Sequence, residues 1–151
     1  MATLYVWLKF AHIVGVGAFL LGHGVSAGTS LVLRRAPTDA VRAALLRVSI
    51  QSAAVYYPAL LLIIVTGVWM GFDGHLWGTK WIWTAIGVLV VVFVIMSALS
   101  VPYHKARDAA NAKPIPEGLE PLVKRGRPVE LAVVGTIGLL ILFFLMVFKP
   151  F

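Results

Sequence analysis

The chain has 151 residues, of which 60% are hydrophobic and only 13% are charged, and its mean hydropathy is +0.94. Soluble domains carry about 45–50% apolar and about 25% charged residues, so this composition excludes an ordinary soluble domain. The absence of cysteine excludes disulfide-stapled folds, thiolate metal sites and cysteine nucleophiles. The formal net charge of +7 is carried between apolar runs, which favours contact with a lipid bilayer and excludes a nucleic-acid partner.

Four stretches are long and apolar enough to cross a bilayer, which takes about 20 residues of helix. They lack the two-residue alternation of barrel strands, so the predicted fold class is all-α. We expect an integral membrane four-helix bundle with antiparallel up-down topology, built as a single domain. The predicted helices cover residues 4–33, 49–72, 81–101 and 129–148.

The first stretch has a second interpretation, as a secretory signal peptide. Val25-Ser26-Ala27 resembles a cleavage site of small residues. However, no positive charge precedes the apolar run, and the run is longer than the usual core of about 7–15 residues. We therefore expect a retained transmembrane helix.

Lysine and arginine are divided unevenly between the two sides of the predicted bundle. Ten of the 13 lie in or beside the loops 34–48 and 102–128, and three lie near the opposite helix ends. The positive-inside rule predicts that these two loops are cytoplasmic and that both termini face outward, in a bacterial-type inner membrane. The predicted outer side also carries an aromatic belt, formed by Trp7, Trp77, Trp81 and Trp83.

Two local patterns predict helix starts. Pro37-Thr38-Asp39 is typical of an N-terminus, so the second helix is expected to begin in the cytoplasm, before its apolar stretch. Pro128, followed by Glu130, suits the first turn of the last helix. Four prolines argue against a long regular helix in the loop 102–128: Pro114, Pro116, Pro121 and Pro128.

Six polar side chains share one face of the first predicted helix. At 100° per residue they fall within about 100° of arc. Ionisable residues inside a span normally face the bundle interior or a water-filled cavity, so this stripe is expected to point inward. Its members are Tyr5, Lys9, His12, His23, Ser26 and Ser30.

The same helix is rich in glycine, at positions 15, 17, 22, 24 and 28. Small residues let membrane helices approach closely, which is the interpretation we favour. The alternative is that they leave room for a flat ligand.

Two histidines on one face of a buried helix are typical of membrane b-type cytochromes, in which paired histidines hold a haem iron. His12 is the predicted axial ligand of a b-type haem. Pairing by depth sets His12 with His75 in the outer loop, and His23 with His104 near the inner end of the third helix. The second pair differs in depth by about 10 Å, which favours one haem near His12 over two. The alternative is that these histidines hydrogen-bond a hydroxyl on the next helix.

Two lysines lie at the same depth as the predicted outer headgroups. Lys9 stands three residues before His12, and Lys80 opens the third helix beside Trp81. Both side chains can snorkel to the headgroups. If either points inward, it can hold a haem propionate.

Short motifs also carry a resemblance. Leu8–Gly15, Arg34-Arg35, Tyr57-Pro58, Thr66–Trp69 and Lys80-Trp81 resemble a family of predicted four-helix integral membrane proteins with no assigned activity. That family is distantly similar to CopD-type copper-resistance domains and to HemJ-type haem-synthesis proteins. In HemJ-type proteins a first-helix histidine and a third-helix lysine are the functional pair and haem is bound. The resemblance implies these roles for His12 and Lys80.

Two functions of different classes remain. The first is a small b-type haem protein with a redox or electron-transfer role. The second is a non-catalytic accessory subunit of a larger membrane complex, or a homo-oligomer. Hydrolytic motifs are absent from the sequence and its carboxylates lie outside the spans or at their ends, which disfavours hydrolysis and proton relays. Whether the chain is an enzyme is left open.

Overall fold

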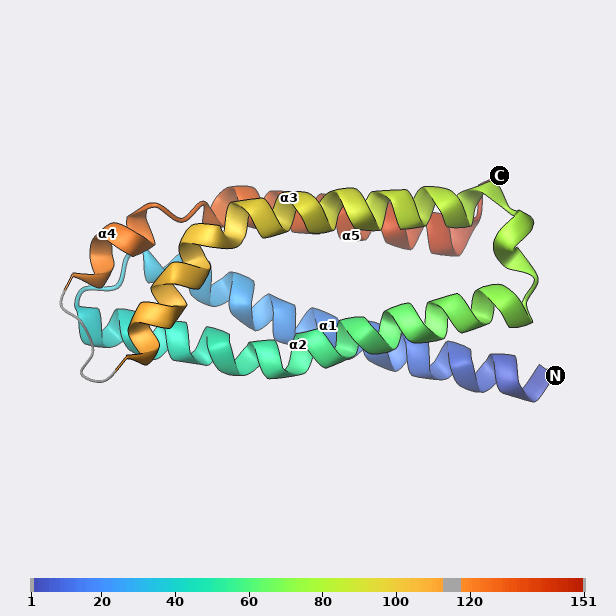
Figure 1. Ribbon diagram of the computed structural model, residues 1–151, viewed down its shortest axis with the longest axis horizontal. Coiled ribbons are helices and arrows are strands. Elements are labelled where there is room, and N and C mark those ends of the chain that lie inside the picture. The colour runs from blue at the N-terminus through green and yellow to red at the C-terminus, as the bar shows by residue number, and fades with distance from the viewer. Residues whose placement is uncertain (1, 113–117, 151) are drawn as a thin grey trace.

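The computed structural model describes residues 2–112 and 118–150, and over these ranges the chain is helical and contains no strand (Figure 1). Four of its helices are long and apolar enough to cross a membrane: α1, α2, α3 and α5. This confirms the predicted all-α class with four spanning helices. The elements are α1 (Ala2–Leu33), α2 (Asp39–Asp73), the 3-10 turn η1 (Leu76–Gly78), α3 (Lys80–Asn111), α4 (Leu119–Lys124) and α5 (Pro128–Phe148).

The spans are arranged as two pairs, α1 with α2 and α3 with α5 (Figure 1). Two glycines of α1 allow α1 and α2 to approach each other closely. A Cβ atom on Gly15 would lie 3.1 Å from Ile63 Cγ1, and one on Gly22 would lie 3.1 Å from the Ser52 carbonyl oxygen. Helices in lipid gain stability mainly from such close packing, because lipid chains are as apolar as the side chains themselves.

The second pair also meets at glycines. A Cβ atom on Gly138 would lie 2.6 Å from Val92 Cγ2, so α3 and α5 approach at a distance that only glycine allows. One turn earlier, Gly135 faces the side chain of Met96. In each pair, glycines with no side chain therefore allow the two helices to pack closely.

The largest cluster of buried apolar residues lies at one end of the molecule. We call this the basic end; it comprises residues 30–50, the last third of α3, and residues 118–130. There α4 packs on α3 and on the start of α2 (Figure 1). The cluster comprises Leu33, Ala43, Leu46, Tyr103, Ala106, Ala110, Leu119 and Val123.

Two predicted boundaries were wrong. The third helix does not end at residue 101 but continues through Pro102 to Asn111, and a further short helix, α4, occupies part of the predicted loop 102–128. Pro102 interrupts one hydrogen bond without ending the helix, and α3 bends in its last third (Figure 1). Beyond it, a buried face with helical spacing holds the extension on the core. Pro114 and Pro116 lie outside the described residues.

The second helix begins at Asp39, ten residues before its apolar stretch, as the N-terminal pattern predicted. Thr38 caps it, since its side-chain oxygen accepts a hydrogen bond from the Val41 backbone amide at 3.3 Å. Asp39 accepts from Arg42 at 2.8 Å and from the Gly118 amide at 2.8 Å, which ties the start of α2 to the segment before α4. Pro128 occupies the first turn of α5, also as predicted.

The opposite end of the molecule carries both ends of the chain and the turn from α2 through η1 into α3 (Figure 1). This turn and the start of α3 hold Trp77, Trp81 and Trp83. Trp77 lies on Gly71, where a Cβ atom would come within 2.8 Å of the indole ring. Its ring centroid is 5.7 Å from that of Trp83, whose indole nitrogen donates to the Trp77 carbonyl at 2.9 Å. We call this the tryptophan end.

Candidate functional site

The six residues predicted from sequence as site residues do not gather in one place. His12 is buried and His23 is half-buried, both at helix contacts of α1. The other four have exposed side chains: Lys9, His75, Lys80 and His104. The polar stripe of α1 therefore points inward from His12 onward, but not at Lys9.

His12 contacts α2 through a hydrogen bond between its Nδ1 and Thr66 Oγ1, 3.0 Å apart. The Thr66 hydroxyl donates its own hydrogen to the Leu62 carbonyl at 2.6 Å, so His12 must be the donor of the interhelical bond. The imidazole also lies against the backbone of Gly67, where a Cβ atom would be 3.3 Å from His12 Cε1. This is the arrangement of a histidine that bonds a hydroxyl on the next helix.

His23 sits in an aromatic setting between helices. Phe19 stacks on its ring at 5.2 Å with an interplanar angle of 8°, and Tyr56 of α2 meets it edge-on at 5.9 Å. Its Nε2 faces α5, 3.6 Å from where a Cβ atom on Gly135 would lie. His23 therefore lies where α1, α2 and α5 come together.

A haem held by the predicted pairs does not fit this geometry. The tautomer of His12 leaves its Nε2 lone pair free, as an iron ligand requires, but the residue is only 9% exposed and lies between α1 and α2. A macrocycle there would have to separate two helices that glycines bring together. His75 lies two residues beyond the end of α2, which is about 10 Å along the axis from Thr66, and both His75 and His104 are exposed.

No group of three or more histidine, aspartate or glutamate side chains able to hold a metal ion occurs in residues 2–112 and 118–150. Two arginines are buried among the described residues: Arg42, which pairs with Asp39 and Glu120, and Arg107, which has no carboxylate partner there. Arg107 of α3 is 6% exposed, and it reaches across to both α1 and α2.

The guanidinium of Arg107 is held by neutral oxygens. Its Nη2 donates to Ser26 Oγ and to the Ser49 carbonyl, each at 2.9 Å, and also to Ser49 Oγ. Its Nη1 donates to the Tyr56 hydroxyl at 3.4 Å. The Tyr103 hydroxyl donates to Ser49 Oγ at 2.9 Å, while the Tyr103 ring lies 4.8 Å from the guanidinium carbon. We call these five residues the arginine network.

The arginine network joins three helices through one positive charge. Arginine cannot lose its proton in a protein, and a charge in a membrane protein is costly unless it is compensated. None of its hydrogen-bond partners among the described residues is a carboxylate, and its buried Nε has no partner at all. Among the described residues, the positive charge of Arg107 is therefore met by neutral oxygens and the Tyr103 ring, with no carboxylate partner.

Sequence reasoning missed Arg107 because it counted this residue among the charges of a cytoplasmic loop. The signal was present: Tyr103, Ala106, Arg107 and Ala110 recur at the spacing of one helix face. All four are buried in the structure. An arginine on an otherwise small and apolar helix face is a candidate for a buried contact.

The comparisons with known proteins agree with the architecture. One family model matches residues 6–150, and its description is "Predicted integral membrane protein (DUF2269)". The chain belongs to this family of predicted integral membrane proteins. Neither the curated proteins nor the solved structures gave a match. The match confirms the predicted membrane family, and the distant likeness to CopD-type and HemJ-type proteins stays a prediction.

Proposed function

We propose that this membrane protein is a non-catalytic subunit that acts by packing α1 against a transmembrane helix of a partner complex. The observation that carries the proposal is the placement of the α1 glycines. Gly15 and Gly22 are used inside the chain, but Gly17, Gly24 and Gly28 have no atom within 4 Å of the position of an added Cβ. They share one face, directed away from α2.

Three glycines on an exposed helix face lower the stability of the helix, and a partner helix that packs against them can offset this loss. Each costs about 1 kcal/mol of helix stability relative to alanine. Gly24 and Gly28 form the small-xxx-small spacing that lets a second membrane helix come close. The flanking side chains are apolar and exposed, for example Leu21 at 75%. This face of α1 is therefore suited to a second helix whose side chains pack over the glycines.

The shape of the chain also favours a partner. Its accessible surface is 9348 Å², whereas a compact monomer of 16.4 kDa exposes about 7,500 Å². The excess arises because the two helix pairs bury few residues against each other in the middle of the spans. Apolar surface of this extent is available to other transmembrane segments as well as to lipid.

The test uses the absence of cysteine in the native chain. A Leu21→Cys variant carries a single thiol at the glycine face, which is labelled with a photoactivatable cross-linker in native membranes. We expect a protein adduct of defined mass. Adding Gly24→Leu and Gly28→Leu should abolish this adduct, because two leucines fill the notch.

The matched control is Val90→Cys, which places a thiol at a position on α3 that is 55% exposed. It should label lipid and give no adduct of defined mass. If Leu21→Cys also labels only lipid, the proposal is wrong. If its only product is a dimer of this chain, the role of accessory subunit is replaced by a homo-oligomer.

We also propose that the basic end faces the cytoplasm of a bacterial-type inner membrane, on the strength of its arginines and lysines. Intact cells carrying Arg35→Cys or Thr79→Cys, treated with a membrane-impermeant maleimide, test this orientation. Thr79→Cys at the tryptophan end should react and Arg35→Cys should not. The reverse pattern would contradict the orientation.

A further inference from the structure

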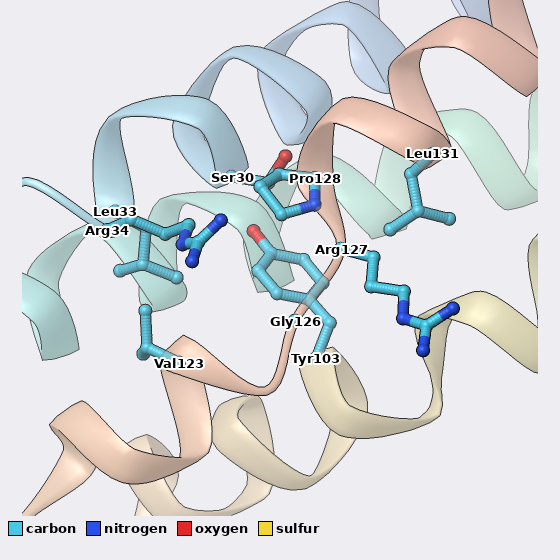
Figure 2. Close-up of a pocket in the computed structure, with 9 residues that line it drawn as sticks. All are labelled: Ser30, Leu33, Arg34, Tyr103, Val123, Gly126, Arg127, Pro128 and Leu131. Atoms are coloured by element: carbon cyan, nitrogen blue, oxygen red, sulfur yellow. The ribbon is translucent and has the colours of Figure 1, made fainter.

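Two hollows at the basic end differ in size. The first surrounds the ring of Tyr103 and has a volume of about 10 Å³, which is room for a single water molecule (Figure 2). The second has a volume of about 100 Å³ and lies between α3 and α4. Of the two, only the second is large enough for a polar group such as a phosphate. We call it the α3–α4 groove; its lining residues are Val101, Pro102, Lys105, Leu122 and Arg125.

The α3–α4 groove is formed by one side of each of its two helices. Val101 and Lys105 are four residues apart on α3, and Leu122 and Arg125 are three residues apart at the end of α4, so each pair projects from one side of its helix. α3 bends in its last third, beyond Pro102, and α4 packs on it there (Figure 1). Each helix therefore contributes one apolar side chain and one cation to the groove.

The two cations of the groove form no ion pair with any carboxylate in residues 2–112 and 118–150. In the same region Glu120 holds both Arg42 and Lys124 in ion pairs. The side chains of Lys105 and Arg125 are exposed, and the residues that line the groove include no acid. The charge of the groove therefore complements an anion, and a zwitterionic headgroup would find no partner there for its own positive charge.

The level of the groove in the bilayer follows from α3. Between Lys80 and Pro102 this helix carries no charged side chain. At a rise of about 1.5 Å per residue, the run 81–101 spans about 31 Å, which matches a hydrocarbon core of about 30 Å. Val101 is the last residue of that run, and it is 49% exposed. The groove thus lies at the boundary between hydrocarbon and headgroups, where the phosphate of a phospholipid is found.

We propose that the α3–α4 groove binds the phosphate group of one anionic phospholipid. Lys105 and Arg125 contact the phosphate oxygens through charge-assisted hydrogen bonds. Val101 and Leu122 pack against the glycerol and the first methylenes of the lipid. A groove that is part cationic and part apolar, at this depth, favours an amphiphilic ligand over a free phosphate ion.

The experiment measures lipid binding by native mass spectrometry of the full chain in detergent. Phosphatidylglycerol is titrated in, with phosphatidylcholine as the zwitterionic reference. We expect the wild-type chain to bind one phosphatidylglycerol in preference to phosphatidylcholine. Replacing both cations of the groove, Lys105→Gln with Arg125→Gln, should weaken the apparent affinity for phosphatidylglycerol about 25-fold, since each lysine or arginine near a membrane surface contributes about a factor of five.

The matched control is Arg35→Gln with Arg47→Gln, which removes the same charge from exposed arginines of the basic end that do not line the groove. The affinity should stay within about twofold of wild type, because attraction to the general surface charge is weak and screened by salt. Equal losses in the two double variants would overturn the groove as a site. All four substitutions are at exposed positions, and circular dichroism checks that each variant is folded.

A second arm separates the lipid from free phosphate. An excess of inorganic phosphate is added to the chain loaded with phosphatidylglycerol, and sodium chloride at the same ionic strength is the reference. If phosphate removes no more lipid than chloride does, the proposal is supported. Removal of the lipid by phosphate alone would show that the groove recognises the bare ion, and would overturn the assignment to a phospholipid.

Discussion

The basic end and the middle of the spans are built on different physical principles. The basic end has a dry core in which Leu46, Ala106 and Leu119 are fully buried. In the middle of α3, residues 86–102 include none that is buried. Burial of apolar surface stabilises only where water is the alternative. The comparison teaches that this chain uses a hydrophobic core where it meets water, and glycine notches and hydrogen bonds where it meets lipid.

The largest expected effect comes from opening the core of the basic end. Leu46→Ala should lower the free energy of unfolding by about 2–5 kcal/mol, because it leaves a cavity in a fully buried site. Val90→Ala, in the middle of α3, should change it by less than about 0.5 kcal/mol. Unfolding in mixed micelles, followed by circular dichroism, measures both. Similar losses at the two positions would mean that the two regions do not differ.

A second test addresses the glycine notch in the middle of the spans. Gly138→Ala places a methyl group 2.6 Å from Val92 Cγ2, so α5 must move away from α3. We expect a loss of about 1–3 kcal/mol. Gly87→Ala on α3 faces open space and should be neutral or slightly stabilising. If Gly138→Ala is also neutral, the α3–α5 contact is looser than described here.

A smaller effect is expected at the bond between His12 and Thr66. A double-mutant cycle with His12→Ala and Thr66→Val should give a coupling energy of about 0.6 kcal/mol, the average for hydrogen bonds between membrane helices. Because a haem does not fit between α1 and α2, the absorbance spectrum of haem-supplemented protein should show no Soret band that depends on His12. A band lost in His12→Ala would restore the haem prediction made from sequence.

The smallest effect concerns an ion pair on the surface of the basic end. A hydrogen bond and the positive charge of Lys124, together with Arg42, lower the pKa of Glu120 below its usual value. A carboxylate whose pKa is lower in the folded state stabilises the fold above the pKa of the unfolded chain, and that contribution is lost as the pH falls through the folded value. We expect the melting temperature to fall slightly on acidification below the ordinary glutamate pKa, and less so in Glu120→Gln. An identical fall in the variant would assign the pH dependence to other groups.

Local patterns in the sequence predicted much of the fold. Thr38 and Pro128 marked helix starts correctly, because capping depends on a few neighbouring residues. The continuation of the third helix to Asn111 was not predicted, because the prolines that follow argue against a long helix in this loop. Packing against Leu33 and Leu46, together with the hydrogen bonds of Arg107, holds the extension in place. The hydrogen bond of His12 was among the alternatives considered, but Arg107 was not.

The sequence by itself determined that this is a membrane protein with four spanning helices, since apolar length is a property of consecutive residues. Only the tertiary structure decided which polar groups meet. Ser26, Ser49 and Arg107 are far apart in the chain, and their contact depends on how α1, α2 and α3 are rotated and how far α3 continues. For the same reason the interior is organised around an arginine at the basic end and not around the paired histidines that the first helix suggested.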